Sequence, residues 1–581
     1  VVLVVGSKSV FTVGRAVILL FSFFFFFSYL CLFNMSGAYS LVVEWELSGR
    51  MGVDLAFPMV LDFTSCVFIS VVLYISGCVV LFSGFYMSHE SFLRRFLDIL
   101  MLFVLSMVFL ILFPSFLSLM MGWDGLGVSS FLLVVYYMDL DSLSAGMITA
   151  LSNRVGDMFF VLGVAVMSFG LGFSSFDVDY IKGLMLSSVG SNLVFVLGML
   201  LVLGSMTKSA VMPFSAWLPE AMAAPTPVSS LVHSSTLVTA GVYVLIRFGD
   251  LAVEFCSCFL MVFSLLTVVM SGMSALSFVD LKKVIALSTL SQVSMMMLSI
   301  SVGAVGIAFF HLLVHAFFKA LMFMCVGSVI FYSGGVQDAR FLGSLWLKMP
   351  LVFSLLISCS LCLVGFPFLS GYYSKELIVS NFLSGYSSLF SFGLVYLSLV
   401  FTFGYTFRMI WLLCTSQSVM LVESFKSNNF YLNGSLLLMS FGAVGSGAVF
   451  QCLMMGMNFY SFMSVHVFYG GLVLISFWLV NIFFLFWIFN ESVIKQGAHD
   501  FVGQLWFMKP LSGGVISSLF LHFSCLVVRF VDMGWIRGFI WKGGLKSFFN
   551  KGTNCVRSVN FNPIGLLLCF SMFLWVLVFF W

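Results

Sequence analysis

Three basic residues occur at a spacing that suits proton transfer. His311, His315 and Lys319 follow one another at intervals of four residues within a long apolar run. On a helix this spacing places them on one stripe, about 6 Å apart along the axis. Ionisable groups at the centre of a bilayer are costly and usually functional. The stripe therefore suggests proton hopping through intervening water.

Metal binding is the rival interpretation of the same stripe. The segment from His311 to His315 lacks the glutamate of a zinc protease motif, and Lys319 would repel a cation. Cys359 and Cys362 form a single Cys-x-x-Cys without a second pair, so a four-thiolate zinc or cluster site has no support. We expect no metal in this chain and interpret its 13 cysteines as small core residues.

Two further lysines lie near helix-breaking prolines. Lys208 precedes Pro213 and Lys375 follows Pro367, each in an apolar run. Pairs of interrupted segments that each carry a charge are typical of inverted-repeat transporters. Asp124 is a candidate partner of Lys208, because a carboxylate that approaches or leaves a buried amine changes the amine's proton affinity. A hundredfold change is worth about 2.7 kcal/mol, comparable to moving a charge through about 100 mV.

Three other ionisable residues lie within or at the ends of apolar runs, namely Arg154, Asp157 and His233. The alternative for any of these charges is a residue at a helix end whose side chain extends to the membrane interface. That alternative is strongest for Arg154 and Asp157, which lie closest to the loop carrying Asp139 and Asp141.

The composition is that of a membrane protein with many spanning helices. Hydrophobic residues make up 62% of the 581 residues and charged residues 8%, whereas soluble domains have about 25% charged residues. The net charge of +3 provides no basic surface for nucleic acid. Apolar runs long enough to cross a bilayer, about 20 residues, occur about fifteen times. They lie near residues 10–33, 58–86, 96–113, 115–137, 146–172, 190–212, 225–247, 254–279, 283–303, 305–331, 350–370, 385–413, 431–455, 465–489 and 563–581.

The composition is also skewed toward residues whose codons are rich in T and G, including 73 Phe and 50 Gly. We interpret this skew as drift of an organelle genome. Adaptation to an unusual bilayer is the alternative.

The C-terminal part has a different distribution of charged residues. From Glu491 to Asn562, lysine, arginine and aspartate residues are scattered among apolar ones. This pattern predicts a long amphipathic helix lying along the membrane or on a partner, followed by an anchoring helix over 563–581. The run from Gly514 to Val531 is apolar enough to span a membrane, but His522 and Arg529 favour the surface position.

Collinear motifs make the chain recognisable. They are Gly122-Trp123-Asp124-Gly125-Leu126-Gly127, Asn153-Arg154-Val155-Gly156-Asp157, Thr207-Lys208-Ser209-Ala210, the stretch from Ala224 to Tyr243, Asp280-Leu281-Lys282-Lys283, His311 to Ala320, and Gly365 to Glu376. The chain resembles the subunit 5 family of mitochondrial NADH–ubiquinone oxidoreductase, respiratory complex I. The likeness is strong over residues 61–408 and thinner beyond.

The resemblance implies an all-α membrane fold of 15 or 16 spanning helices with two inverted five-helix repeats and a lateral C-terminal helix. The implied segments are N-terminal helices over 1–95, a first repeat over 96–250, a second over 251–415 and additional helices over 416–490. The lateral helix with its linkers occupies 491–562, and the terminal anchor 563–581.

The resemblance also assigns roles to residues. Asp124 stands where an acidic residue pairs with the lysine at Lys208, and Lys375 stands at the terminal lysine. The central relay comprises His233, His311, His315 and Lys319. Arg154, Asp157 and Glu376 support the path, and Pro213 and Pro367 break the helices. Two positions depart from the family, because Val211 replaces a glutamine and Glu376 a common aspartate.

The implied function is proton translocation in the mitochondrial inner membrane, driven by oxidation of NADH by ubiquinone. No cofactor is expected in this chain, because NADH, FMN, the Fe–S clusters and ubiquinone belong to partner subunits. Expected partners are other membrane subunits of complex I, especially the neighbouring antiporter-like subunit 4, and lipids such as cardiolipin. A free-standing cation/proton antiporter and a purely structural subunit are the alternatives.

Overall fold

The computed structural model describes residues 12–24, 26–29, 40–48, 55–170, 191–385, 389–415 and 429–456, and, nearer the C-terminus, 501–511, 514, 517–541 and 550–551. The chain forms two compact units, Val1–Met508 and Lys509–Trp581.

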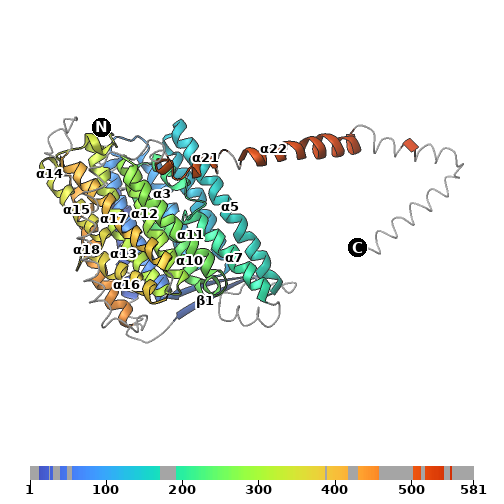
Figure 1. Ribbon diagram of the computed structural model, residues 1–581, viewed down its shortest axis with the longest axis horizontal. Helices are drawn as coiled ribbons and strands as arrows, with labels where there is room; N and C mark the ends of the chain where they lie inside the picture. The colour runs from blue at the N-terminus through green and yellow to red at the C-terminus, as the bar shows by residue number, and fades with distance from the viewer. Residues whose placement is uncertain are drawn as a thin grey trace. The chain divides into compact units, whose positions relative to one another are not determined.

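The first unit is a helical bundle (Figure 1). Its long helices are Thr12–Tyr29, α2 Phe63–Tyr86, α3 Leu93–Leu112, α4 Phe116–Val134, α5 Leu140–Gly170, α7 Ser191–Lys208, α10 Leu237–Arg247, α11 Gly249–Ser277, α12 Leu281–Ser301, α13 Val305–Tyr332, α15 Pro350–Val364, α16 Ser370–Gly385, α17 Leu389–Thr415 and α18 Phe430–Gly456. Short helices connect them: η1 Val135–Tyr137, α8 Trp217–Glu220, η2 Ala221–Ala223, α9 Thr226–Leu231, the π-helical η3 Val232–Thr236, η4 Ala339–Phe341 and α14 Leu345–Lys348.

Twelve helices of the described residues are long and apolar enough to cross a membrane. Eleven coincide with predicted runs, and the twelfth, Ser517–Trp535, lies in the second unit. The predicted runs 190–212 and 350–370 contain the shorter apolar helices Phe195–Lys208 and Pro350–Val364. The runs 465–489 and 563–581 lie outside the described residues. The fold is that of an α-helical membrane protein with many spans.

Burial separates an inner layer of helices from an outer one. The spanning stretches of α12 and α13 are buried completely inside the bundle, whereas only 28% of that of α5 is buried. The outer helices expose large apolar side chains such as Met158 and Phe441. Such side chains would destabilise a soluble protein, but lipid tails solvate them. α12 and α13 therefore form the core that can isolate charges from lipid.

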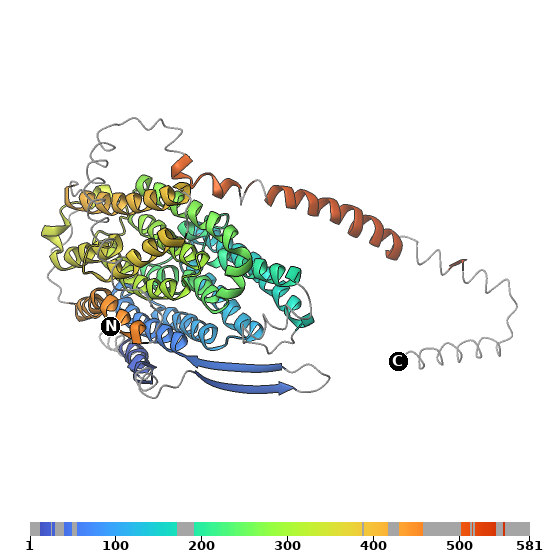
Figure 2. The same ribbon diagram turned by 60° about the horizontal axis from the view of Figure 1, so that its bottom comes forward.

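A β-hairpin interrupts the all-α pattern. Strands β1 (Ser40–Ser48) and β2 (Leu55–Asp62) pair antiparallel, as Figure 2 shows. The predicted helical run 58–86 begins within β2, and α2 starts only at Phe63. Ser65 Oγ accepts a hydrogen bond from the Asp62 backbone N–H at 2.8 Å, which marks the helix start. Pro58, which lacks an N–H, is better accommodated in an edge strand than inside a helix.

The two interrupted helices end in the same backbone motif. After α7, the Val211 N–H reaches the Met206 carbonyl at 3.0 Å, and Ala210 adopts a left-handed φ of 55°. After α15, the Phe366 N–H reaches the Leu361 carbonyl at 3.0 Å, and Gly365 has φ 87°. Both are Schellman motifs, in which a left-handed residue closes the helix. The helices thus end before Pro213 and Pro367, so the left-handed residues close them and the prolines only prevent their continuation.

The second unit contains one described helical segment, α22 Ser517–Val527 followed by the π-helical η6 Val528–Trp541. The short α21, Met508–Pro510, spans the boundary between the units. None of the side chains of α22 is buried. Residues 491–500 and nearly all of 542–562 lie outside the described part, so the lateral helix over 491–562 stays a prediction.

Candidate functional site

Lys208 is buried against the backbone and ring of a tryptophan. It is the last residue of α7 and is 0% exposed. Its ammonium Nζ donates a hydrogen bond to the carbonyl oxygen of Trp123 on α4 at 2.7 Å. The same nitrogen lies 3.7 Å from the centroid of the Trp123 ring. Both contacts stabilise a positive charge, since a carbonyl dipole and an aromatic face each present negative potential.

Two aspartates surround this lysine. Asp157 on α5 accepts a hydrogen bond from Trp123 Nε1 at 2.8 Å and one from Arg154 Nη1 at 3.1 Å. Asp124 is less engaged, because its Oδ1 atom is buried without a hydrogen-bond partner among the described residues. Both carboxylates lie within electrostatic range of Lys208. Trp123, Asp124, Arg154, Asp157 and Lys208 are called the Lys208 cluster below.

This arrangement differs in detail from the expected pair of Asp124 and Lys208. Among the described residues the lysine forms no direct salt bridge, and its nearest acceptor is a backbone carbonyl. Arg154 is largely exposed, with 63% of its side chain accessible, whereas Asp157 faces inward with 14% accessible. The alternative of a side chain extending to the surface therefore fits Arg154 and does not fit Asp157.

The predicted stripe lies on α13 at the centre of the bundle. His311, His315 and Lys319 are each at most 1% exposed. Lys319 Nζ donates to Ser288 Oγ on α12 at 2.5 Å. The two ring nitrogens of His311 contact Ser374 Oγ at 2.8 Å and Gln292 Oε1 at 3.3 Å. One imidazole thus connects α12 to α16.

Lys375 uses the carbonyls that the broken helix leaves free. Its Nζ donates to the carbonyl oxygens of Leu363 and Val364, at 3.4 and 3.5 Å, and to Thr402 Oγ1 at 3.1 Å. Leu363 and Val364 end α15, where carbonyls lack helical N–H partners. Ser374, which contacts His311, precedes Lys375 directly in the chain. Ser288, Gln292, His311, Lys319, Ser374, Lys375 and Thr402 are called the central cluster below.

Three predicted residues stand apart from these hydrogen bonds. His233 lies in η3, and His315 lies between His311 and Lys319; neither imidazole has a hydrogen bond to the described residues. The His315 ring is 6.2 Å from the His311 ring, and the His233 ring is 6.3 Å from that of Trp217. Glu376 is buried next to Lys375 in the chain, with 2% exposure. No hydrogen bond among the described residues joins the Lys208 cluster to the central cluster.

Several residues of both clusters were not predicted individually. Trp123 was visible only as part of a motif, and Ser288, Gln292 and Thr402 are uncharged polar residues in apolar helices. Outside both clusters, Lys282 is a further buried lysine that was not predicted individually: it is 4% exposed, and its Nζ donates to the Ala224 carbonyl at 3.2 Å. Polar side chains inside spanning segments were the available signal. Within the described residues no group of three His, Cys, Asp or Glu side chains is arranged to hold a metal.

Comparison with known families covers nearly the whole chain. The family described as NADH:quinone oxidoreductase/Mrp antiporter, TM, matches residues 114–402. NADH-Ubiquinone oxidoreductase (complex I), chain 5 N-terminus, matches 47–97, and NADH dehydrogenase subunit 5 C-terminus matches 405–581. The first match contains both clusters.

Individual proteins agree with these families. NADH-ubiquinone oxidoreductase chain 5 of Locusta migratoria is 39% identical over 591 residues, covering 96% of this chain and 99% of that protein. The chain 5 of Mytilus edulis is also 39% identical, covering 87% of each.

Two solved structures share the fold at 22% identity. The Mrp complex from Dietzia sp. superposes with a TM-score of 0.70, covering 91% of this chain and 61% of that one. An archaeal membrane-bound sulfane sulfur reductase superposes with 0.68, covering 78% of this chain and 91% of that one. The fold, the matched segments and the identity over nearly full length agree: this chain belongs to the NADH-ubiquinone oxidoreductase chain 5 family.

Proposed function

We propose that the chain is a proton-translocating membrane subunit of respiratory complex I in the mitochondrial inner membrane. Oxidation of NADH by ubiquinone in the same complex supplies the energy. The observation that carries the proposal is the set of four buried ionisable residues, Lys208, His311, Lys319 and Lys375, each hydrogen-bonded inside a bundle of spanning helices. Several kcal/mol of desolvation at each position is difficult to explain unless the charges act.

The central cluster suits a relay. Ser288 can accept a proton from Lys319 while its own hydroxyl proton moves on, so the serine is neutral before and after. His311 contacts Gln292 on one ring nitrogen and Ser374 on the other, so it can receive a proton on one side and release it on the other. Water must carry the proton past His315, whose nitrogens have no protein partner in the described part of the chain. Lys375 then holds it against the carbonyls of α15.

The Lys208 cluster suits a switch. A lysine that faces two aspartates changes its proton affinity when either aspartate moves. Asp157 is fixed by Trp123 and Arg154, whereas Asp124 has a free buried oxygen. Asp124 is therefore the carboxylate whose movement would control Lys208. Arg154, Asp157, His233 and Glu376 act as supporting groups in this proposal.

The remaining roles extend the same proposal. The redox chemistry, with NADH, FMN, Fe–S clusters and ubiquinone, resides in partner subunits. Residues 96–250 and 251–415 form the two inverted repeats, which the matching Schellman motifs after α7 and α15 support. The exposed apolar side chains of α22 suit a lateral contact with neighbouring membrane subunits such as subunit 4. Lipids such as cardiolipin surround the spanning helices in this proposal.

Replacing single lysines by methionine tests the proposal, because methionine keeps the length of the side chain and removes its charge. We expect Lys319→Met and Lys208→Met each to lower the number of protons translocated per NADH oxidised, in assembled complex reconstituted into vesicles. Lys283→Met is the matched control, since that lysine is 40% exposed at the start of α12. Full proton yield in both buried variants, with the complex intact, would favour a purely structural subunit.

The similarity in fold to the Mrp complex favours one alternative, a free-standing cation/proton antiporter. Co-purification discriminates the two functions. A complex I subunit purifies together with redox subunits in a fixed proportion. A free-standing antiporter purifies without any redox subunit.

A further inference from the structure

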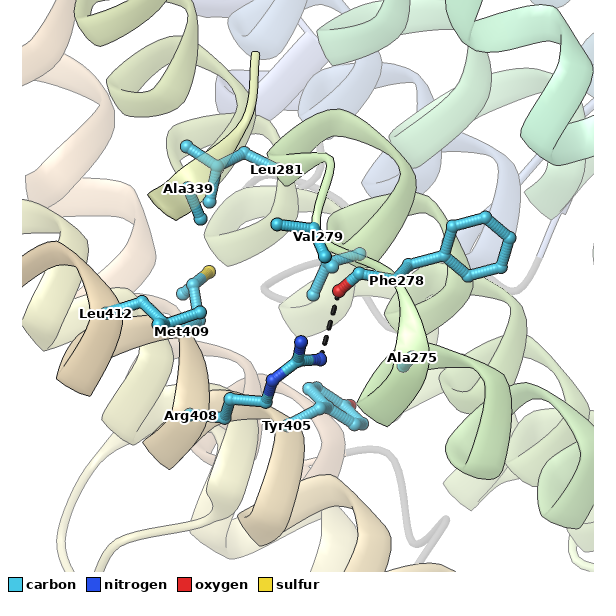
Figure 3. A pocket seen from close by; sticks show the side chains of 10 residues that line it. Ala275, Phe278, Val279, Leu281, Ala339, Tyr405, Arg408, Met409 and Leu412 are labelled. Atoms are coloured by element: carbon cyan, nitrogen blue, oxygen red, sulfur yellow. Dashed lines mark hydrogen bonds between the residues drawn. The ribbon is translucent and has the colours of Figure 1, made fainter. Parts of the chain in front are cut away.

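A small pocket lies beside the central cluster, where α11 ends and α12 begins. Its wall is mostly apolar, with Phe278, Val279 and Met409 among the lining residues, and its polar groups come from Tyr405 and Arg408 of α17 (Figure 3). The pocket has room for about one water molecule. Neither polar residue belongs to the clusters described above.

Arg408 closes one side of the pocket by capping α11. Its Nη1 atom donates to the carbonyl oxygen of Phe278 at 3.0 Å and also to that of Leu276. These carbonyls lie at the C-terminal end of α11, where helical partners are missing. The arginine is only partly buried, so this side of the pocket lies near the surface of the bundle.

Tyr405 forms the inner side. It lies three residues before Arg408, so both side chains occupy the same face of α17. Its ring is 2% exposed, and its hydroxyl faces Ser288, Ser291 and Gln292 of α12. The hydroxyl forms no hydrogen bond of regular geometry to the described residues. This buried phenol therefore has possible hydrogen-bond partners on both sides, namely the polar side chains of α12 on one side and water in the pocket on the other.

The residues that Tyr405 faces are those that hold the relay. Ser288 accepts the hydrogen bond of Lys319, and Gln292 contacts His311. The order from the pocket inward is therefore Arg408, Tyr405, Ser288 and Gln292, then Lys319 and His311. This order links the pocket to the centre of α13 through the hydroxyls of Tyr405 and Ser288, which can exchange protons, to the amine of Lys319.

We propose that Tyr405 passes protons between water in this pocket and the central cluster. The inference rests on the proposed function and adds an access route to it. The tyrosine hydroxyl gives its proton to one neighbour as it takes a proton from the other, so it is neutral before and after. Arg408 is held at the outer side of the pocket by its hydrogen bonds to α11.

Tyr405→Phe removes only the hydroxyl and tests the route in the assembled complex in vesicles. We expect this variant to lose the same share of protons per NADH as Lys319→Met, with its proton transfer slowed at least about tenfold. Tyr396→Phe on the same helix, where the residue is 37% exposed, should retain the full yield. Full yield in Tyr405→Phe together with loss in Lys319→Met would overturn the route and leave the proposed function intact. Full yield in both would overturn both.

Water access provides a second measurement that does not depend on activity. Met409 lines the pocket and is 4% exposed, whereas Met296 on α12 is 0% exposed and does not line it. In otherwise unchanged complex, we expect a small charged thiol reagent to label Met409→Cys above the background of the native cysteines, and not Met296→Cys. Equal absence of labelling at both positions would show a dry pocket and overturn the proposal, whether or not Tyr405→Phe assembles.

Discussion

Trp123 connects two charges, those of Lys208 and Asp157, through three different parts of one residue. Its carbonyl oxygen accepts from Lys208, its ring lies under the same ammonium, and its indole N–H donates to Asp157. A lysine and an aspartate are thereby held close without direct contact. Direct pairing would fix the proton on the lysine, whereas separation by a polarisable ring leaves the lysine responsive to small movements of either carboxylate. The tryptophan therefore sets the range over which the proton affinity of Lys208 can change.

Two substitutions separate these contributions. Trp123→Phe removes the hydrogen bond to Asp157, about 1.5–3 kcal/mol for a bond to a charged group, but keeps an aromatic face for Lys208. Trp123→Leu also removes that face, worth about 2 kcal/mol when desolvated. We expect thermal stability and proton yield to fall in both variants, and further in Trp123→Leu. Trp411→Phe, at a position 55% exposed, is the control; a Trp123→Leu protein equal to the parent would contradict the role.

At the scale of helices, the matching ends of α7 and α15 bring functional groups to the interruptions. Lys208 is the last residue before the first interruption, while Lys375 follows the second and returns to its carbonyls. The two lysines therefore lie on opposite sides of their breaks along the chain. Their hydrogen-bond acceptors differ accordingly, because Lys208 donates to a carbonyl of α4 and Lys375 donates to carbonyls at the end of α15.

The left-handed residues at these two helix ends predict opposite changes in stability for opposite substitutions. Ala210 adopts φ 55°, which costs about 1 kcal/mol for a residue with a Cβ atom, whereas Gly365 occupies φ 87° without that cost. We expect Ala210→Gly to raise the thermal unfolding midpoint slightly and Gly365→Ala to lower it.

Ala216→Gly is the control for the first change, because Ala216 has an ordinary φ of −68° and glycine there should only destabilise. An Ala210→Gly protein that loses as much stability as Ala216→Gly would show that the first helix end carries no strain.

These elements also show what the sequence could predict. The positions of His311, His315 and Lys319 on one buried face followed from their spacing, and most spanning helices followed from apolar runs. The acceptors of Lys208 and Lys375 did not, since backbone carbonyls have no signature in a sequence. The β-hairpin was also missed, because the apolar residues of β2 continue directly into α2. Pro367 drew attention to the second break, but the helix ends at Gly365, where backbone geometry decides.

At the scale of the whole molecule, the ionisable residues of both clusters lie in the first unit, while the second contains a helix without buried side chains in its described part. Within Ser517–Trp541, Phe520, Phe530 and Trp535 are at least 67% exposed. Large aromatic side chains in this state need a lipid or protein surface. We therefore expect separable tasks for the two units, ion transfer in the first and attachment in the second.

Ending the chain after Met508 tests this division. We expect the shortened chain to keep a cooperative thermal transition, because the first unit retains its buried core, but to be absent from assembled complex on native gels. The full-length chain with the same purification tag is the control. Normal assembly and full proton yield of the shortened chain would contradict an attachment role for residues 509–581.

We expect the π-helical turn over Val232–Thr236 to allow a local rotation within its helix. Such a turn contains one residue more than an α-helical turn, so converting it to α-helix would rotate the preceding residues by about 100° relative to α10. His233 lies in this turn without a hydrogen bond to the described residues, so nothing polar there opposes its turning toward a new neighbour. A screw-like shift of one residue within the spanning helix Thr226–Arg247 could thus connect and disconnect an imidazole. Structures captured during turnover would reveal it as an α-helical turn at these five residues, and an unchanged wide turn in every state would exclude it.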